Sequence, residues 1–296
     1  MRVINRIVLF VLLAAFLQAC TRQAVQWPPV SATPTGQFTP GRWVWADLVS
    51  DDPEQAKAFY GQVFGWQFSN AGSSDSPYFL VLQKKQPIAG ISRFKKQAGS
   101  QRAARWIGLL SVESVAQASQ SISKAGGKVH IPKKHLPGRG DFALASDPEG
   151  ALFGLIRSDS GDPEDQLPGI NNFFWRELWA NDASAMAKFY RSFAHYEIAH
   201  KNTLNDVDEV YLSVGEKLRA GIIQVQHANI SSAWLPYIRV ANLKQALEKV
   251  RQAKGEILIA PSENVRKGMV AIIMDPQGAA LGLVEWPEGM RGEMIR

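Results

Sequence analysis

The sequence is poor in the residues that cross-link a fold or hold a metal ion. Its single cysteine, Cys20, excludes an intramolecular disulfide bond. The apolar run at residues 7–17 is too short to cross a bilayer, since a spanning helix needs about 20 residues. We expect solvated or capping roles for the five histidines, because none stands at a spacing typical of a zinc site: His130, His135, His195, His200 and His227.

Charge of one sign is also scarce. The formal net charge is +6, and two of the positive charges, Arg2 and Arg6, lie in the N-terminal leader. Such a small surplus argues against nucleic acid as a partner. With 296 residues, of which 46% are hydrophobic, the chain suits two globular domains of roughly 120 residues each. Nine tryptophans, several of them in repeated segments, predict aromatic-lined concavities.

The N-terminus has the pattern of a bacterial export signal. A basic head is followed by the apolar run, and the tetrapeptide Leu-Gln-Ala-Cys that ends at Cys20 resembles a lipobox. This resemblance implies cleavage after residue 19, lipidation of Cys20 and a membrane anchor on the bacterial cell envelope. The lack of aspartate at Thr21 favours the outer membrane, facing the periplasm. The alternative is a plain secretory signal with an incidental cysteine.

A long internal repeat organises the rest of the chain. Residues 45–48, Asp52 and the pair Phe59-Tyr60 recur as residues 175–178, Asp182 and the pair Phe189-Tyr190, at a constant offset of 130 residues. A period of this length indicates a duplicated domain rather than a solenoid. The expected parts are a signal peptide (1–19), Cys20 with a flexible tether (20–40), a first domain (41–158), a linker (159–169) and a second domain (170–288).

Local patterns give each domain two similar halves. Residues 42–48 alternate like a strand, which predicts Trp43, Trp45 and Asp47 on one face. Asp52 and Pro53 then predict a helix start, and an apolar stripe follows at helical spacing. Three short strand-like runs complete the half, and the order strand, helix, strand, strand, strand begins again near residue 106. The sequence therefore predicts an α+β fold with four βαβββ units.

The paired βαβββ units, the Phe-Tyr pair and the Asp-Pro-x-Gly turns at Asp147 and Asp275 together resemble the vicinal oxygen chelate (VOC) superfamily. That superfamily includes glyoxalase I, bleomycin-resistance proteins and extradiol dioxygenases. The resemblance implies two tandem domains, each a cupped mixed sheet with its helices outside. It also implies metal ligands at four positions, where this sequence has residues without a suitable donor: Trp45, Gly154, Trp175 and Gly282. We therefore expect no metal at the usual site and no cofactor.

Two carboxylates are the sharpest candidates for a site. Asp47 and Glu177 each stand two residues after a tryptophan, and so share the strand face that points into the cup in this superfamily. In one interpretation they anchor a cationic or hydroxylated ligand, with tryptophans stacking on it. In the other, each is a structural carboxylate bonded to backbone donors or to an arginine. The candidate ligand-binding residues are Trp43, Trp45, Asp47, Trp175 and Glu177.

Three functions remain open. The first is a lipid-anchored protein that binds a small organic molecule in aromatic cups without metal, and we favour it. The second is a metal-dependent lyase, isomerase or dioxygenase with unconventional ligands, and the third is a non-catalytic envelope scaffold. We expect a monomer whose two domains pack as a pseudo-dimer, and a basic patch between Lys84 and Arg105 is a further candidate contact with anionic lipid.

Overall fold

The computed structural model describes residues 26–73, 77–94, 104–204, 207–225 and 231–286, with the backbone alone for residues 201–204 and 207. The signal peptide, Cys20, His227 and residues 95–103 of the basic patch lie outside the described residues. Within those ranges, no helix combines the length and the apolar character needed to cross a membrane.

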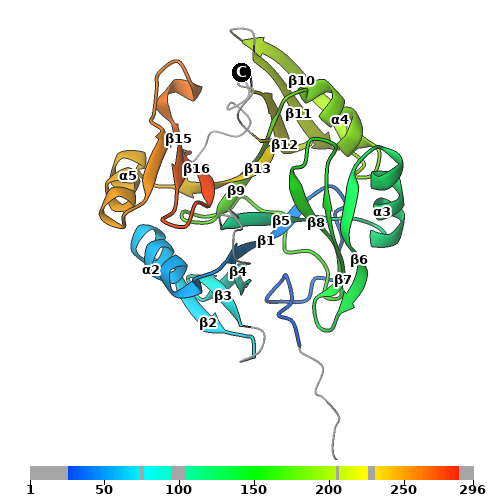
Figure 1. Cartoon of the computed structure of the whole chain (residues 1–296), viewed down its shortest axis with the longest axis horizontal. Helices are drawn as coiled ribbons and strands as arrows, with labels where there is room; N and C mark the ends of the chain where they lie inside the picture. Colours follow the sequence, from blue (N-terminus) through cyan, green and yellow to red (C-terminus); the bar gives the residue numbers. More distant parts are fainter. Residues whose placement is uncertain (1–25, 74–76, 95–103, 205–206, 226–230, 287–296) are drawn as a thin grey trace, which may run out of the picture.

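Four βαβββ units follow one another along the chain, as predicted (Figure 1). The first domain contains β1 Trp43–Ser50, α2 Pro53–Phe64, β2 Gln67–Asn70, β3 Tyr78–Gln83, β4 Gln86–Arg93, β5 Arg105–Ser111, α3 Val115–Lys124, β6 Lys128–Leu136, β7 Gly140–Ser146 and β8 Leu152–Ser158. The second contains β9 Phe173–Ala180, α4 Ala183–Arg191, β10 Glu197–Leu204, β11 Val207–Val214, β12 Lys217–Gln224, β13 Ala233–Val240, α5 Leu243–Gln252, β14 Glu256–Ile259, the short 3₁₀ turn η2 Arg266–Gly268, β15 Val270–Met274 and β16 Ala280–Glu285.

Each domain forms one eight-stranded mixed sheet, which confirms the predicted α+β class. The strand orders are β2-β3-β4-β1-β5-β8-β7-β6 and β10-β11-β12-β9-β13-β16-β15-β14. Within a unit the first strand pairs in parallel with the last, and the two first strands pair antiparallel at the middle of the sheet. Both sheets curl, and in Figure 1 the first opens toward the bottom and the second toward the top.

The capping residues that the sequence suggested do begin the first helix of each domain. The carboxylate of Asp52 accepts hydrogen bonds from the backbone of Glu54 and Gln55, with Pro53 at the first helical position. Asp182 caps α4 in the same way through Ala185. The apolar stripe of each helix is buried against the convex side of a sheet.

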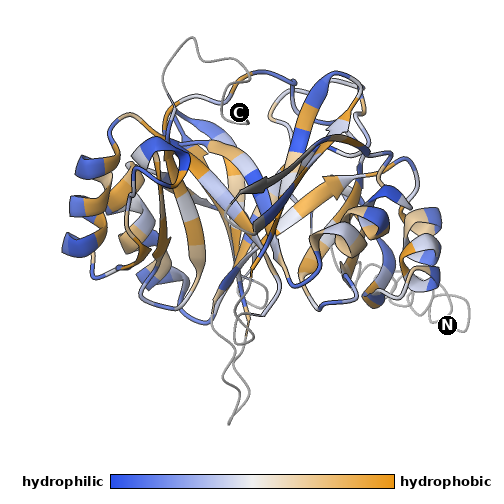
Figure 2. Ribbon diagram, turned by 90° about the horizontal axis from the view of Figure 1, so that it is seen from above, coloured by the Kyte–Doolittle hydropathy of each residue, from blue (hydrophilic) through white to orange (hydrophobic). Residues whose placement is uncertain are grey.

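The helices bring the two domains together in crossed pairs. Helix α2 lies beside α5, and α3 beside α4, at opposite ends of the molecule (Figures 1 and 2). One apolar core joins α3 and β8 of the first domain to α4, β11 and β12 of the second. The other joins α2 and β4 of the first domain to α5, β15 and β16 of the second. Each helix-side core is therefore built from both domains.

The repeated sequence motifs meet across this domain boundary. The hydroxyl of Tyr60 donates to Asp275 at 2.8 Å, and that of Tyr190 donates to Asp147 at 3.0 Å. Each hydroxyl also accepts a hydrogen bond from an indole N–H, that of Trp106 for Tyr60 and that of Trp234 for Tyr190. The tyrosine of each Phe-Tyr pair thus bonds to the aspartate of the Asp-Pro-x-Gly turn in the other domain.

The segment predicted to be a flexible tether is, in its described part, packed on the first domain. Residues 26–31 lie at the open side of the first sheet, where Val30 is buried. Composition alone predicts a flexible segment, but it does not show that Val30 packs against the apolar side chains of the first sheet. The polar linker is also held in place, because Asp162 accepts from the backbone of Thr39 and the hydroxyl of Ser111.

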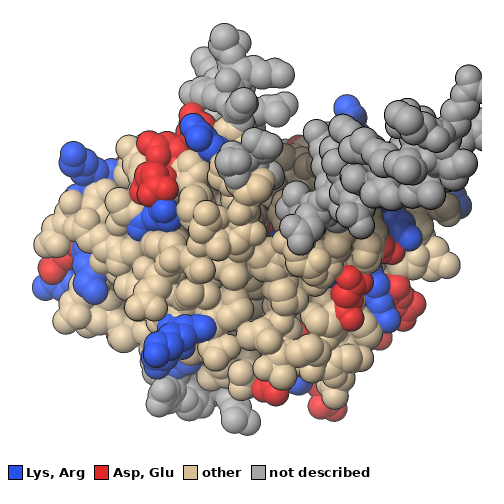
Figure 3. Space-filling model, turned by 90° about the horizontal axis from the view of Figure 1, so that it is seen from below, with Lys and Arg blue, Asp and Glu red and all other residues tan. Residues whose placement is uncertain are grey.

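Surface charge is mixed. Around the margin of the face in Figure 3, basic and acidic side chains lie close to one another, and its centre is uncharged. Lys84 and Lys85, from the predicted basic patch, form the tight turn between β3 and β4, both with positive φ. Contact of this patch with lipid stays a prediction.

Candidate ligand cups

The first cup is the concave face of the first sheet. Its apolar lining consists of Val44, Trp45, Leu109 and Ile156, and these pack against Val30 from the N-terminal segment. Trp45 is only 3% exposed. The buried lining therefore contains one tryptophan among aliphatic side chains, and a piece of the chain's own N-terminus lies against it.

Asp47 points into this cup and is fully engaged. One carboxylate oxygen accepts from the hydroxyl of Tyr78 at 2.6 Å and from the indole N–H of Trp45 at 3.0 Å. The other lies 3.2 Å from Nη1 of Arg139. Gly90, on the neighbouring strand, makes this possible, because a Cβ there would collide with the Tyr78 hydroxyl and the Asp47 carboxylate.

Arg139 is the buried centre of the first cup. It is 1% exposed, and its three donor groups reach Asp47, the Tyr78 hydroxyl at 2.7 Å and the carbonyl of Pro28 at 2.8 Å. Its guanidinium also lies 5.1–5.5 Å from the ring centres of Tyr78, Trp45 and Trp27. Burial acts to lower the pKa of Arg139, but Asp47 and Tyr78 outweigh that effect and raise it.

The second cup is the concave face of the second sheet. Its lining comes from β13, β15 and β16, with Trp286 beyond the last strand: Leu235, Tyr237, Val270, Ile272, Val284 and Trp286. Phe174, Trp175 and Trp179 pack on this lining and remain partly exposed. No residue of the described N-terminal segment belongs to this cluster.

Glu177 occupies the position of Asp47 in the second cup. It is 1% exposed and accepts from the hydroxyl of Tyr237 at 2.6 Å and the indole N–H of Trp179 at 3.2 Å. Its second oxygen pairs with Arg266. The two cups therefore satisfy their carboxylates with the same three kinds of donor, an arginine, a tyrosine hydroxyl and an indole N–H.

The charge balance differs between the cups. Arg266 lies 3.9 Å from a second carboxylate, Glu209, which also accepts from the hydroxyl of Tyr211 at 3.0 Å. Burial acts to lower the pKa of Arg266, but Glu177 and the tyrosines outweigh it and raise the pKa. Two carboxylates thus face one guanidinium in the second cup, where the first cup pairs one with one.

Trp43 lies outside the first cup, so its predicted place on the same strand face as Trp45 is wrong. The pairing of β1 with β5 shifts by one residue between these two tryptophans, and this bulge turns Trp43 to the convex side. There its ring centre lies 4.6 Å from that of Trp234. The buried Arg176 also lies over Trp43, and burial lowers the pKa of this guanidinium to about 9.

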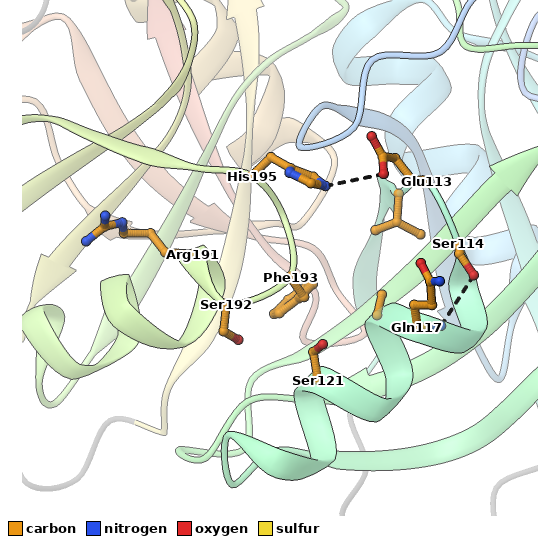
Figure 4. Close-up of a pocket in the computed structure, with 10 residues that line it drawn as sticks. Glu113, Ser114, Gln117, Ser121, Arg191, Ser192, Phe193 and His195 are labelled. Carbon is orange, nitrogen blue, oxygen red and sulfur yellow. Dashed lines mark hydrogen bonds and ion pairs between the residues drawn. The ribbon is translucent and has the colours of Figure 1, made fainter.

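A polar hollow of about 210 Å³ lies between α3 and α4 (Figure 4). His195 and Glu113 face each other across it at 3.8 Å, and both side chains are more than half exposed. The exposure of His195 agrees with the solvated role that the sequence predicts. Because its charged groups pair only weakly in solvent, this hollow is a weaker candidate site than either cup.

Comparisons with known proteins bear on both domains. The sequence profile of the Glyoxalase/Bleomycin resistance protein/Dioxygenase superfamily matches residues 42–155. The first domain is a member of this superfamily. The whole chain is 22% identical to "Putative glyoxylase CFP32" of Mycobacterium tuberculosis over 258 residues, which is 84% of this chain and 96% of that protein.

The other similarities also extend across both domains. The "Anthracycline biosynthesis protein DnrV" of Streptomyces peucetius is 26% identical over 272 residues, which is 86% of this chain and 96% of that protein. The Mn(II)-bound glyoxalase from Novosphingobium aromaticivorans has a TM-score of 0.57 at 15% identity, covering 84% of this chain and 83% of its own. The glyoxalase-superfamily fold is thus present in tandem.

The metal site that the superfamily implies does not fit the residues at its usual positions. A Cβ at Gly282 would collide with the ring of Tyr237, and one at Gly154 with the side chain of Leu109. Trp45 and Trp175 offer no lone pair to a cation. Across the ranges that the structure describes, no three or more His, Cys, Asp or Glu side chains are grouped so that they could hold a metal ion.

The sequence did not identify the arginines and tyrosines that engage the two carboxylates. The need of a buried carboxylate for a cation predicts an arginine, but 33 lysines and arginines were available and no spacing selects among them. Arg139 and Arg266 come from the segments before β7 and β15, far along the chain from Asp47 and Glu177. Whether Asp47 and Glu177 contact a ligand stays a prediction.

Proposed function

We propose that this chain is an envelope-anchored binding protein whose second cup holds a small planar organic molecule. The observation that carries the proposal is the difference between equivalent tryptophans. Trp175 remains partly exposed, whereas Trp45, at the same place in the repeat, is only 3% exposed. An aromatic wall that stays accessible above a satisfied polar centre suits stacking of a flat ligand.

The polar groups of the second cup support the same class of ligand. Tyr211, Tyr237 and Trp179 have already donated to the carboxylates, so the centre offers little unsatisfied polarity and favours an apolar ring system. The surplus carboxylate, Glu209, favours a ligand with a hydrogen-bond donor or a positive charge at its edge. The name of DnrV refers to anthracyclines, which are planar polycyclic compounds.

A binding titration tests the proposal. The soluble chain from Thr21 onward is titrated with a tetracyclic anthracycline, and the quenching of tryptophan fluorescence is followed. We expect one site per chain. Trp175→Leu should weaken binding at least tenfold, and Trp45→Leu, the same change in the first cup, should leave the affinity unchanged. Equal effects of the two substitutions, or an absence of binding at solubility-limited concentration, would contradict the proposal.

Metal analysis separates this proposal from the metal-dependent alternative. The same protein, purified without a metal-affinity tag, is examined by elemental mass spectrometry. A stoichiometric manganese, iron or zinc ion would favour the lyase, isomerase or dioxygenase function, with ligands away from the usual positions. A metal-free chain that binds the anthracycline would favour the binding protein.

The envelope location is part of the proposal and rests on the leader alone. Incorporation of labelled palmitate into the full chain, compared with Cys20→Ser, tests the lipid anchor. We expect label in the wild type only, and label in neither protein would leave a plain secretory signal as the better interpretation.

A further inference from the structure

The N-terminal segment, residues 26–31, occupies the first cup as a ligand would. Its contacts come from several parts of the cup. The backbone N–H of Trp27 donates to the carbonyl of Pro137 at 2.8 Å, and its ring meets that of Tyr78 edge-on at 5.3 Å. Val30 is 1% exposed and packs in the apolar lining with Trp45 and Leu109. Figure 1 shows this segment, in dark blue, at the open side of the first sheet.

The segment also supplies a specific polar group. The carbonyl of Pro28 accepts the Nε–H of Arg139 at 2.8 Å, whereas the other two donor groups of this arginine are bound within the domain, to Asp47 and Tyr78. If the segment left, this one N–H would lose its acceptor at the floor of the cup. A buried guanidinium donor without an acceptor is unfavourable, so the empty cup would favour a molecule that brings an oxygen there.

Few hydrogen bonds join residues 26–31 to the first domain. Residues 26–31 form no helix or strand, and Pro28 and Pro29 have no backbone N–H to donate. The chain becomes firmly attached only from Thr35, where the backbone N–H groups of Thr35 and Gly36 both donate to the carbonyl of Ser160. A ligand could therefore replace residues 26–31 without disturbing the attachment that follows.

We propose that residues 26–31 are a displaceable internal ligand that closes a second binding site in the first cup. When the segment is withdrawn, the site takes an aromatic molecule that carries a carboxylate or carbonyl oxygen. The indole of Trp27 marks the place of its ring, beside Tyr78, and the carbonyl of Pro28 marks the place of its oxygen, on Arg139. This site does not depend on ligand binding in the second cup.

The class of ligand follows from charges as well as shape. Asp47 already has Arg139 as its partner, so among the described residues of the first cup this carboxylate is not free to attract a cation. The one bond of Arg139 that a ligand would replace is donated by its Nε–H to the carbonyl of Pro28, so the ligand must bring a hydrogen-bond acceptor. An organic cation is therefore excluded from this cup, in contrast to the second cup with its surplus Glu209.

Deletion of residues 21–34 from the soluble chain tests the proposal directly, since Thr35 and its bonds remain. The probes are indole-3-acetate, which has an indole ring and a carboxylate, and 3-methylindole, which has the ring alone. Calorimetric titration is carried out in the Trp175→Leu background so that the second cup does not contribute. We expect the deletion to bind indole-3-acetate at least tenfold more tightly than the undeleted chain, with a smaller gain for 3-methylindole.

Two further measurements make the outcome decisive. Val30→Asp in the otherwise complete chain should release the segment to protease and raise the affinity for indole-3-acetate, while Val265→Asp, at a position that is 47% exposed, should change neither. A synthetic peptide of residues 26–31 should compete with indole-3-acetate for the deleted chain. A deleted chain that does not fold, or folds without binding the probe, overturns the proposal, and equal gains for both indoles overturn the assigned ligand class.

Discussion

Replacing Tyr190 with phenylalanine tests how the two domains are held together. Its hydroxyl donates to Asp147 of the first domain at 3.0 Å and accepts from Trp234 at 2.7 Å, and it is completely buried. Without it, one carboxylate oxygen and one indole N–H lose their partner in the interior. Each loss costs about 1–3 kcal/mol, so Tyr190→Phe should lower the free energy of unfolding by about 2–6 kcal/mol.

Thermal and urea unfolding of the soluble chain measure this effect. For a chain of this size Tm falls by about 2 °C per kcal/mol, so a loss of about 2–6 kcal/mol corresponds to a fall in Tm of about 4–12 °C. Tyr196→Phe is the matched control, because the hydroxyl of Tyr196 is also buried but has no hydrogen-bond partner among the described residues. It should change the unfolding free energy by less than about 1 kcal/mol.

A double-mutant cycle with Asp147→Asn locates the effect at the domain boundary. If the hydroxyl acts through the carboxylate, the loss in the double variant should be smaller than the sum of the single losses by about 1–3 kcal/mol. Additive losses, or a Tyr190→Phe effect no larger than that of Tyr196→Phe, would refute the idea that the paired motifs join the domains.

Three other substitutions or conditions give measurable outcomes. Burial raises the pKa of Asp147 from 3.8 to about 6. The folded state therefore favours protonated Asp147, which contributes about 3 kcal/mol to the free energy of unfolding below about pH 4, and this contribution is lost as the pH rises through 6. Asp147→Asn should flatten that part of the plot of stability against pH. Arg139→Met leaves the carboxylate of Asp47 without its cation and should lower the free energy of unfolding, measured in urea, by about 3–5 kcal/mol. A smaller loss in the Arg139→Met and Asp47→Asn double variant than in Arg139→Met alone would confirm the ion pair. Additive losses would contradict it. Gly282→Ala places a methyl group against the ring of Tyr237 and should lower the free energy of unfolding by about 1–3 kcal/mol, seen as a lower Tm. Gly169→Ala, with open space around it, should leave Tm unchanged. Equal effects of the two substitutions would show that packing is not the cause.

The sequence predicts the fold in detail because its signals are local. The cap at Asp52, the turn at Asp147 and the apolar stripes each depend on residues close together in the chain, and the repeat doubles every such signal. The partners of Asp47 and Glu177 could not be predicted in this way, because Arg139 and Arg266 lie far from them in the sequence and are brought close only by the folded sheets. The same limit explains Trp43, whose face is changed by a bulge that strand alternation alone does not reveal.

The two cups began as copies, and the structure shows where they differ. The convex sides of the two sheets are joined, because each helix-side core contains elements of both domains and the hydroxyls of Tyr60 and Tyr190 bond across the boundary. A change of shape at the back of one cup would therefore disturb a core that both domains share. The concave faces share no such core. The first cup is covered by residues 26–31, whereas the second keeps Trp175 and Trp179 partly exposed. The covering segment and the different charges around Arg139 and Arg266 would give one chain the two proposed sites with opposite preferences, an acceptor oxygen at Arg139 and a donor or positive charge at Glu209.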